Sequence, residues 1–206
     1  MIFENKEWIY RSLYECVKMH AQTDGEKDYL ITEEETISYA EALNAVENLG
    51  TQLLSWGVKK GDFVGLRVTN SADTSLIMTA LGSIGAVAVC CDAHFGVEEY
   101  INNSGVDMHP NWYITNENAG KSITASGNWG FKTSNGQEEK IEFEYAQNLA
   151  TEAYHEATKK VDGDDVFLIL FTSGSTGRVK RQCSRIKIAW SFLMNPYSFI
   201  NKTKTT

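Results

Sequence analysis

Apolar runs of strand length, alternating with helix-like patterns, constrain the fold of this chain more than any other feature. The runs are DFVGLRV (62–68), AVAVCC (86–91) and VFLILF (166–171). Strands that are apolar along nearly their whole length are typical of parallel sheets, because helices cover both faces of such sheets. We therefore predict an α/β fold in which a parallel sheet is flanked by helices.

The helical patterns between these runs have clear starts and stops. Ser38 with Glu41 fits a capping box, which satisfies exposed N–H groups at a helix start, and Gly57 supplies the stop. Ser71 starts a second helix, which Gly85 closes. Elsewhere we expect helices over 4–20 and 145–158, short strands at 28–32, 35–38 and 112–115, a helical turn at 97–103, and a surface loop with at most one strand over 116–140.

Charge argues against a nucleic-acid partner. The chain has a net charge of −8, with 19 basic and 27 acidic residues. Seven of the basic residues and none of the acidic ones follow Gly177, which leaves residues 1–177 with a charge of −15. Such a body repels a nucleic-acid backbone. The basic tail fits an anion-binding arm or an altered C-terminus, and we favour the second interpretation.

Cysteine and histidine spacing predicts no metal site. Cys90 and Cys91 are adjacent, so they would point to opposite faces of a strand, and neither they nor Cys16 and Cys183 form a C-x-x-C pair. This pattern indicates free thiols in a reducing, cytoplasmic location. The histidines are scattered, and we expect no metal-binding residues. The charged N-terminus and the lack of a long apolar run predict neither a signal peptide nor a transmembrane segment.

The segment that carries chemistry is VFLILFTSGSTGRVK, residues 166–180. A predicted buried strand, Val166–Phe171, changes abruptly into hydroxyl residues and glycines, and Lys180 follows. Glycines let backbone N–H groups approach phosphates closely, while hydroxyls and an ammonium group add donors. Open α/β sheets bind ligands at the carboxyl ends of their strands. The candidate phosphate-binding residues are Thr172, Ser173, Gly174, Ser175, Thr176 and Gly177.

This segment differs from the Walker pattern, because Lys180 lies three residues past Gly177 and no Ser or Thr follows it. It resembles T-S-G-S-T-G-x-P-K-G, the phosphate-binding signature of the adenylate-forming superfamily of acyl-CoA synthetases, nonribosomal peptide adenylation domains and luciferases. Thr172 to Gly177 and Lys180 match that signature, whereas Val179 replaces the proline and Arg181 replaces the last glycine.

Upstream stretches resemble the same family in order and spacing. Residues 37–89 are similar to its first helix, its G-V-x-x-G-D-x-V turn and its N-S helix leading to a G-A-V strand. The family then has a P-L-D-P-like stretch, of which CCDAHFG (90–96) keeps only Asp92. The resemblance covers about residues 5–180. The matching residues are Gly57, Val58, Gly61, Asp62, Val64, Asn70, Ser71, Gly85, Ala86 and Val87.

The resemblance implies a partial N-terminal domain of the adenylate-forming fold over residues 1–180, followed by a divergent basic tail over 181–206 that is helical in part. Relatives use ATP to activate a carboxylic acid as acyl-AMP, releasing pyrophosphate. Many then pass the acyl group to CoA or to the phosphopantetheine of a carrier protein. By resemblance, Thr172–Gly177 would hold the β- and γ-phosphates, and Mg²⁺ would offset charge on the phosphate oxygens. Lys180 would act in catalysis by assisting the leaving pyrophosphate.

The family's adenine, ribose and C-terminal lysine motifs have no counterpart before Thr206. The resemblance therefore implies an N-terminal portion of a ligase, inactive as this isolated chain or completed by a complementary C-terminal chain. An alternative is a non-catalytic nucleotide- or phosphate-binding module that retains only the phosphate loop. A third is an interaction protein that works through its tail, where a helical face over 186–193 would pack on the sheet or, less favoured, lie on a membrane surface.

Overall fold

The computed structural model of the 206-residue chain describes residues 12–92, 97, 101–102, 110–117, 127–133, 135–173 and 179–185, and for 172–173 and 179–185 it describes the backbone alone. The helices are α1 (Leu13–Asp24), α2 (Tyr39–Ser55), α3 (Ala72–Ser83) and α5 (Glu152–Thr158). Val97, Ile101 and Asn102 are also helical. The strands are β1 (Asp28–Ile31), β2 (Thr36–Ser38), β3 (Phe63–Val68), β4 (Val87–Asp92), β5 (Trp112–Asn116), β6 (Trp129–Thr133), β7 (Glu138–Lys140), β8 (Val166–Ser173) and β9 (Val179–Arg185).

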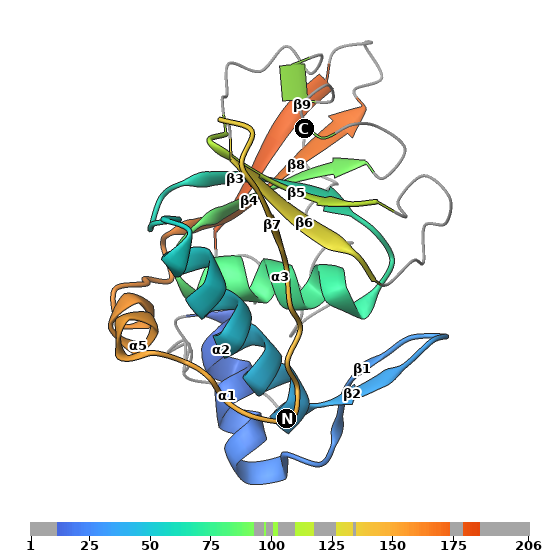
Figure 1. Cartoon of the computed structure of the whole chain (residues 1–206), viewed down its shortest axis with the longest axis vertical. Coiled ribbons are helices and arrows are strands. Elements are labelled where there is room, and N and C mark those ends of the chain that lie inside the picture. Colours follow the sequence, from blue (N-terminus) through green and yellow to red (C-terminus); the bar gives the residue numbers. More distant parts are fainter. Residues whose placement is uncertain are drawn as a thin grey trace, which may run out of the picture.

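One sheet of seven strands, in the order β7-β6-β5-β3-β4-β8-β9, forms the centre of the fold (Figure 1). Its central strands β5, β3, β4 and β8 are parallel, and the three apolar runs supply β3, β4 and β8. Both edges are antiparallel, with β6 and β7 on one side and β9 on the other. The predicted α/β fold with a parallel sheet is confirmed, and the antiparallel edges are an addition to it. The strands β1 and β2 form a separate antiparallel hairpin.

The sheet buries both faces, as its apolar strands require. On one face α3 lies next to the sheet, and α2 and α1 pack against α3 (Figure 1). Along β4, Cys90 packs on this helical face, whereas Cys91 packs on the opposite face with Val97 and Ile101. The expectation that the two adjacent cysteines point to opposite faces is therefore confirmed.

The helix starts and stops read from the sequence are confirmed. The backbone N–H of Glu41 donates to Ser38 Oγ at 3.3 Å, and the backbone N–H of Ser38 donates to Glu41 Oε2 at 2.9 Å. Gly57 (φ +95°) and Gly85 (φ +75°) follow α2 and α3 in the left-handed region that favours glycine. Of the helix expected over 4–20, the described part begins at Leu13, and residues 1–11 lie outside the described residues.

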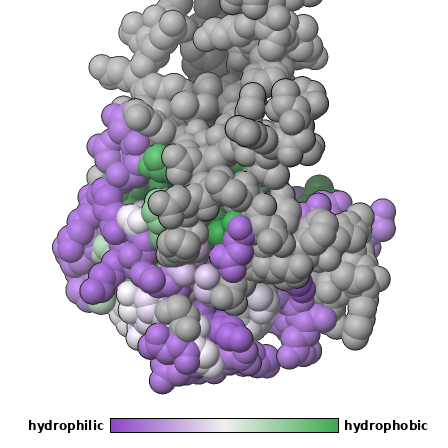
Figure 2. Space-filling view, turned by 90° about the horizontal axis from the view of Figure 1, so that it is seen from above, coloured by the Kyte–Doolittle hydropathy of each residue, from purple (hydrophilic) through white to green (hydrophobic). Residues whose placement is uncertain are grey.

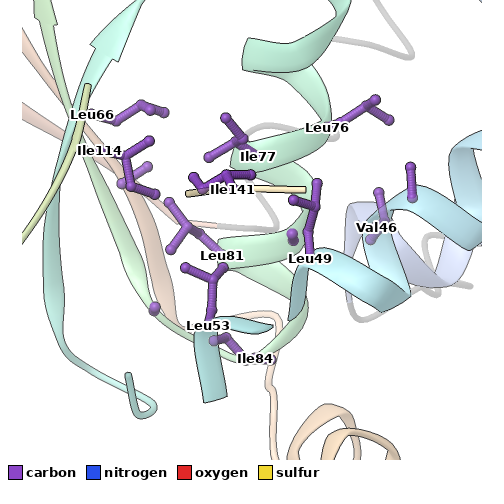
Figure 3. Close-up of a cluster of buried hydrophobic side chains, with 14 of the residues drawn as sticks. Val46, Leu49, Leu53, Leu66, Leu76, Ile77, Leu81, Ile84, Ile114 and Ile141 are labelled. Atoms are coloured by element: carbon purple, nitrogen blue, oxygen red, sulfur yellow. The ribbon is translucent and has the colours of Figure 1, made fainter. Parts of the chain in front are cut away.

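A cluster of branched apolar side chains fills the space between α2, α3 and the sheet (Figure 3). Each of the side chains named below is at most 2% exposed, and full burial of one such side chain contributes about 1.5–3 kcal/mol. The cluster sets the distance between helices and sheet. Its members are Val46, Leu49 and Leu53 from α2, Leu76, Ile77 and Leu81 from α3, and Leu66 and Ile114 from β3 and β5.

The expectation of a surface loop with at most one strand over 116–140 is wrong for its second half, where two strands, β6 and β7, extend the sheet. Residues 118–126 and 134 lie outside the described residues. Trp129 and Phe131 are 1% and 0% exposed. Phe131 stacks on Trp56 and Trp112, with ring centroids 4.6 Å and 5.4 Å apart. In WGFKT, large apolar residues alternate with Gly and Lys, which is a strand pattern that the polar composition around it obscured. Trp129 and Trp112 both pack in the core cluster.

The helix expected over 145–158 is wrong for its first half, because α5 begins only at Glu152 and residues 141–151 form an extended segment. We call this segment the strap. It runs along α2, whose amide side chains one helical turn apart bind its backbone. These side chains are Asn44, which donates to Tyr145 O at 2.7 Å, Gln52, which donates to Glu142 O at 2.7 Å, and Asn48, which lies between them.

A buried carboxylate joins α1, α2 and the strap. Glu47 is 2% exposed and accepts hydrogen bonds from the Tyr14 hydroxyl, at 2.6 Å, and from Asn148 Nδ2. The Lys18 ammonium lies 3.8 Å from the same carboxylate. Burial raises the pKa of the Tyr14 phenol far above its ordinary value, so this hydroxyl remains a donor. These partners satisfy a charge that would otherwise destabilise the core.

Hydrophilic residues dominate the described surface in the view from above (Figure 2). Among the described residues, the large apolar side chains that are exposed come from four separate segments. They are Ile31, Phe63, Leu149 and Leu170. A search of the described residues finds no helix both long and apolar enough to cross a membrane.

The proposed boundary between residues 180 and 181 falls inside β9, so the first five residues of the tail continue a strand that pairs with β8. The helical face expected over 186–193 lies outside the described residues. The division into 1–180 and 181–206 and the cytoplasmic location stay predictions.

Candidate phosphate-binding site

The candidate site lies at the connection between β8 and β9. β8 runs parallel to β4, with Cys90 paired to Leu170, and β9 returns antiparallel to β8. The register pairs Thr172 with Lys180 and Ser173 with Val179. The two strands therefore hold both ends of the phosphate motif next to each other.

The predicted site residues divide into two groups. Thr172 and Ser173 form the end of β8, and Lys180 is the second residue of β9. Gly174 to Gly177 lie outside the described residues. The sequence prediction ended the strand at Phe171, but β8 continues for two residues because β9 supplies paired partners for them.

The end of β8 and the start of β9, at Ser173 and Val179, lie at the edge of the sheet that the sequence predicted. The strands β3, β4, β5 and β8 are parallel, so their carboxyl ends share one edge. Ligands of open α/β sheets bind outside these carboxyl ends. The location of the segment agrees with this rule, and the binding role of its residues stays a prediction.

β8 is less buried than the sequence indicated. Ile169 is 1% exposed, as expected for a core strand, but Leu170 is 40% exposed. β8 is second from the edge of the sheet, so fewer elements cover it than cover β3 and β4. The expectation of a buried strand therefore holds for Ile169 alone, because Leu170 is exposed and the other four residues are half-buried: Val166, Phe167, Leu168 and Phe171.

The donor set fits a ligand with several negative charges. From Val166 to Lys180 the chain contains no Asp or Glu, but it contains four hydroxyl residues, two glycines and two cations. Backbone N–H groups and hydroxyls bind phosphate oxygens, and an ammonium group offsets their charge. The β- and γ-phosphates of ATP are a ligand of this kind.

Hydroxyl groups that follow the carboxyl end of β3, two strands away from β8, bind one another and cap α3. Thr69 Oγ1 lies 2.8 Å from both Ser71 Oγ and Thr74 Oγ1. Ser71 is the N-cap of α3, and its Oγ accepts from the Thr74 backbone N–H. All three residues are buried. Their arrangement stabilises the helix start rather than leaving donors for a ligand.

A buried carboxylate near this edge was not found by sequence reasoning. Asp73, in the first turn of α3, is 4% exposed. Its Oδ2 accepts from Trp129 Nε1 at 2.8 Å and from the Gly127 backbone N–H at 2.9 Å. Burial raises the pKa of Asp73 above its ordinary value, although the two hydrogen bonds oppose this shift. Asp73 therefore anchors the start of β6 to α3, and a lone Asp in a helix start gives no sequence signal for that role.

Thiols and histidines in the described part of the chain do not form a reactive centre. Burial raises the pKa values of Cys90 and Cys91 to about 12, which keeps both thiols protonated at neutral pH. His20 packs on the ring of Tyr39. Within the described residues, no group of three His, Cys, Asp or Glu side chains is placed to hold a metal ion.

A hollow of about 530 Å³ lies over β5, β6 and β7. Its lining includes Thr115, Gly130, Lys132 and Lys140. β3 and β4 separate this hollow from β8, so it does not belong to the candidate phosphate site. Chemistry and strand topology, rather than cavity size, therefore identify the candidate site.

A family model described as "AMP-binding enzyme" matches residues 17–181. Acetyl-coenzyme A synthetase 2 of Saccharomyces cerevisiae is 28% identical over 198 residues, which cover 81% of this chain and 28% of that protein. Acetyl-coenzyme A synthetase of Bdellovibrio bacteriovorus is 30% identical over 195 residues, which cover 81% of this chain and 30% of that protein. The chain thus spans less than a third of the length of these curated relatives.

Solved structures show the same fold. The N-terminal subdomain of Klebsiella oxytoca NpsA, in complex with 3-hydroxybenzoyl-AMSN, superposes with a TM-score of 0.58. The match has 20% sequence identity and covers 86% of this chain and 42% of that chain. At this identity the similarity concerns the fold alone.

Proposed function

Because the chain belongs to the AMP-binding enzyme family, we propose that it forms the N-terminal, phosphate-binding part of an ATP-dependent adenylate-forming ligase. In the proposed reaction, a carboxylic acid attacks the α-phosphorus of ATP, acyl-AMP forms and pyrophosphate leaves. The acyl group then passes to the thiol of CoA or of a carrier phosphopantetheine. Similarity to acetyl-coenzyme A synthetases supports an acyl-CoA synthetase-like ligase.

One observation carries this proposal: the phosphate motif connects the carboxyl end of a central parallel strand to an antiparallel return strand. The pairing of Thr172 with Lys180 sets the two ends of the motif side by side. The hydroxyl residues at the end of β8 and the cation at the start of β9 therefore come from neighbouring strands at the edge where ligands of open α/β sheets bind.

In the proposed site, Thr172–Gly177 hold the β- and γ-phosphates through N–H groups and hydroxyls. Lys180 stabilises the negative charge that grows on pyrophosphate as it leaves. Mg²⁺, when bound, supplies further positive charge to the phosphate oxygens. We expect the phosphates to bring this ion to the site, because Mg²⁺ commonly binds through substrate phosphates.

The share of the relatives that the chain covers supports a second proposal. Less than a third of each acetyl-coenzyme A synthetase is matched, so we expect the isolated chain to bind polyphosphate weakly and to need a complementary C-terminal chain for catalysis. The alternative is a non-catalytic phosphate-binding module.

Calorimetry on the full 206-residue chain tests the binding role. We expect heat from ATP and from pyrophosphate, and at least about a tenfold loss of affinity in Lys180→Ala, which removes a charge-assisted contact. Gly174→Val, which adds a branched side chain at a glycine of the motif, should weaken binding as well. Lys132→Ala is the matched control, because it removes a cation from β6, which lies near the opposite end of the strand order from β8 and β9. The absence of heat with the unaltered chain, or an equal loss in the control, refutes the phosphate site.

Pyrophosphate exchange with a panel of carboxylic acids separates the ligase from the alternative. We expect no exchange with the isolated chain. Exchange that appears when a C-terminal portion of a relative is added supports the ligase. Robust exchange by the isolated chain contradicts the requirement for a complementary chain, and binding without exchange in either mixture favours the non-catalytic module.

A further inference from the structure

The hairpin of β1 and β2 projects from the body of the fold (Figure 1). Its base is fixed, because Ile37 is 3% exposed and the ring centroids of Tyr29 and Tyr39 lie 5.0 Å apart. Among the described residues, β1 and β2 pair only with each other. Ile31, the last residue of β1, is 72% exposed, more than any other large apolar side chain in the described part of the chain. The hairpin thus presents an apolar side chain to solvent on a fixed support.

The turn of this hairpin has a defined shape. Thr32 Oγ1 accepts hydrogen bonds from the backbone N–H groups of Glu34, at 3.2 Å, and Glu35, at 3.0 Å. The Thr32 backbone N–H donates to Glu35 O at 2.9 Å. Glu33 lies inside this turn and is exposed. A surface that is ordered before its partner arrives binds with a smaller loss of entropy.

The turn lies beside the carboxyl edge of the sheet, near the start of α3. A hollow of about 340 Å³ between them is lined by Ile31, Thr32, Glu33 and Glu34 from the hairpin and by Asn70, which follows β3. Burial raises the pKa of Asp73 in the first turn of α3, and the negative charge of Glu34 adds to this rise, which also places the turn near α3. The hairpin therefore stands beside the edge at which ligands of open α/β sheets bind.

From these observations we propose that the hairpin is a docking site for the complementary C-terminal chain, which contacts Ile31 through apolar side chains and Glu33 through basic ones. The inference rests on the proposed function, in which the chain needs that partner for catalysis.

Two observations select this partner. The chain spans less than a third of the acetyl-coenzyme A synthetases that it matches. The remainder of such a ligase has to reach the carboxyl edge, beside which the hairpin stands, in order to complete the proposed site. The turn also contributes three consecutive glutamates, residues 33–35. Complementary charge is common across interfaces, so the surface that fits this turn is basic around an apolar centre.

Biolayer interferometry tests the site, with the full 206-residue chain and the C-terminal portion of the Bdellovibrio bacteriovorus acetyl-coenzyme A synthetase as the probe. We expect Ile31→Ser to weaken binding about tenfold, because the burial of an apolar side chain is lost. Glu33→Lys should weaken it about tenfold as well, because like charges then face each other. Leu149→Ser, on the strap, and Glu139→Lys, on exposed β7, are the matched controls and should change the affinity less than about twofold. Binding of the unaltered chain should weaken as salt is added.

The possible results separate the docking site from the function on which it depends. If the unaltered chain neither binds the C-terminal portion nor gains pyrophosphate exchange from it, the need for a complementary chain is refuted, and the docking site with it. If the unaltered chain binds and both hairpin variants bind equally well, the need for a partner stands and the hairpin is not its docking site. Sedimentation of the chain alone tests a second copy as the occupant, and self-association that Ile31→Ser abolishes would overturn the choice of partner.

Discussion

The strap is held on α2 mainly through Asn48, so truncation of this side chain should destabilise the fold strongly. Asn48 is 3% exposed. Its Nδ2 donates to Glu144 O at 3.0 Å and to Gln147 O at 2.9 Å, and its Oδ1 accepts from the Leu149 backbone N–H at 2.6 Å. Asn48→Ala removes all three bonds at once and leaves their backbone partners without the side chain.

The expected loss follows from these contacts. A hydrogen bond contributes about 1 kcal/mol net, and a buried polar group left unsatisfied costs about 1–3 kcal/mol. Water can reach part of the strap, so we take the lower figure for each bond and expect Asn48→Ala to lower the free energy of unfolding by about 3 kcal/mol. Asn44→Ala, with one such bond, should cost about 1 kcal/mol or less, and Gln52→Ala, which removes two bonds to Glu142 at a half-buried position, about 1–2 kcal/mol.

Urea unfolding, followed by tryptophan fluorescence, measures all three variants. Trp56 and Trp129 pack in the same core cluster as Ile141 of the strap, so their fluorescence reports on the unfolding of this core. A loss below about 1 kcal/mol for Asn48→Ala, or a loss equal to that of Gln52→Ala, would show that the strap is held by apolar packing rather than by the amide ladder.

Two further predictions concern the core. Gly50→Ala should lower stability by about 1–3 kcal/mol in urea unfolding, although alanine favours helices, because the new Cβ would lie within 2.8 Å of Cδ2 of the buried Tyr154 ring. The same change at Gly82, where the nearest atom lies 3.7 Å away, should be neutral or stabilising, and a loss there would refute the reasoning. Burial in the folded state raises the pKa of Asp73, so ionisation of Asp73 destabilises the fold. The wild type should therefore lose stability relative to Asp73→Asn as the pH rises from the ordinary aspartate pKa through the raised pKa. Unfolding at pH 4.5 and 7 measures both proteins, and a wild type that gains stability relative to Asp73→Asn as the pH rises would contradict the prediction.

The candidate site could be predicted from the sequence because its residues are close neighbours along the chain. Thr172, Ser173 and Lys180 belong to one short motif whose composition points to phosphate, and the strand before it predicts the edge at which it lies. The sequence does not predict which strand lies beside β8. The sheet order places β4 there, although a long stretch of chain separates the two strands.

Helix starts, helix stops and apolar strands could be predicted from the sequence, because their causes are local. Ser38 and Glu41 satisfy N–H groups within their own helix, Gly57 adopts a backbone conformation that other residues avoid, and apolar runs pair in a covered sheet whatever their neighbours are. The strap, the β6–β7 extension and the Asp73–Trp129 bond have no such local cause. Each exists because packing brings distant groups together and a buried polar atom must then find a partner, a condition that arises only once the helices and the sheet are in place.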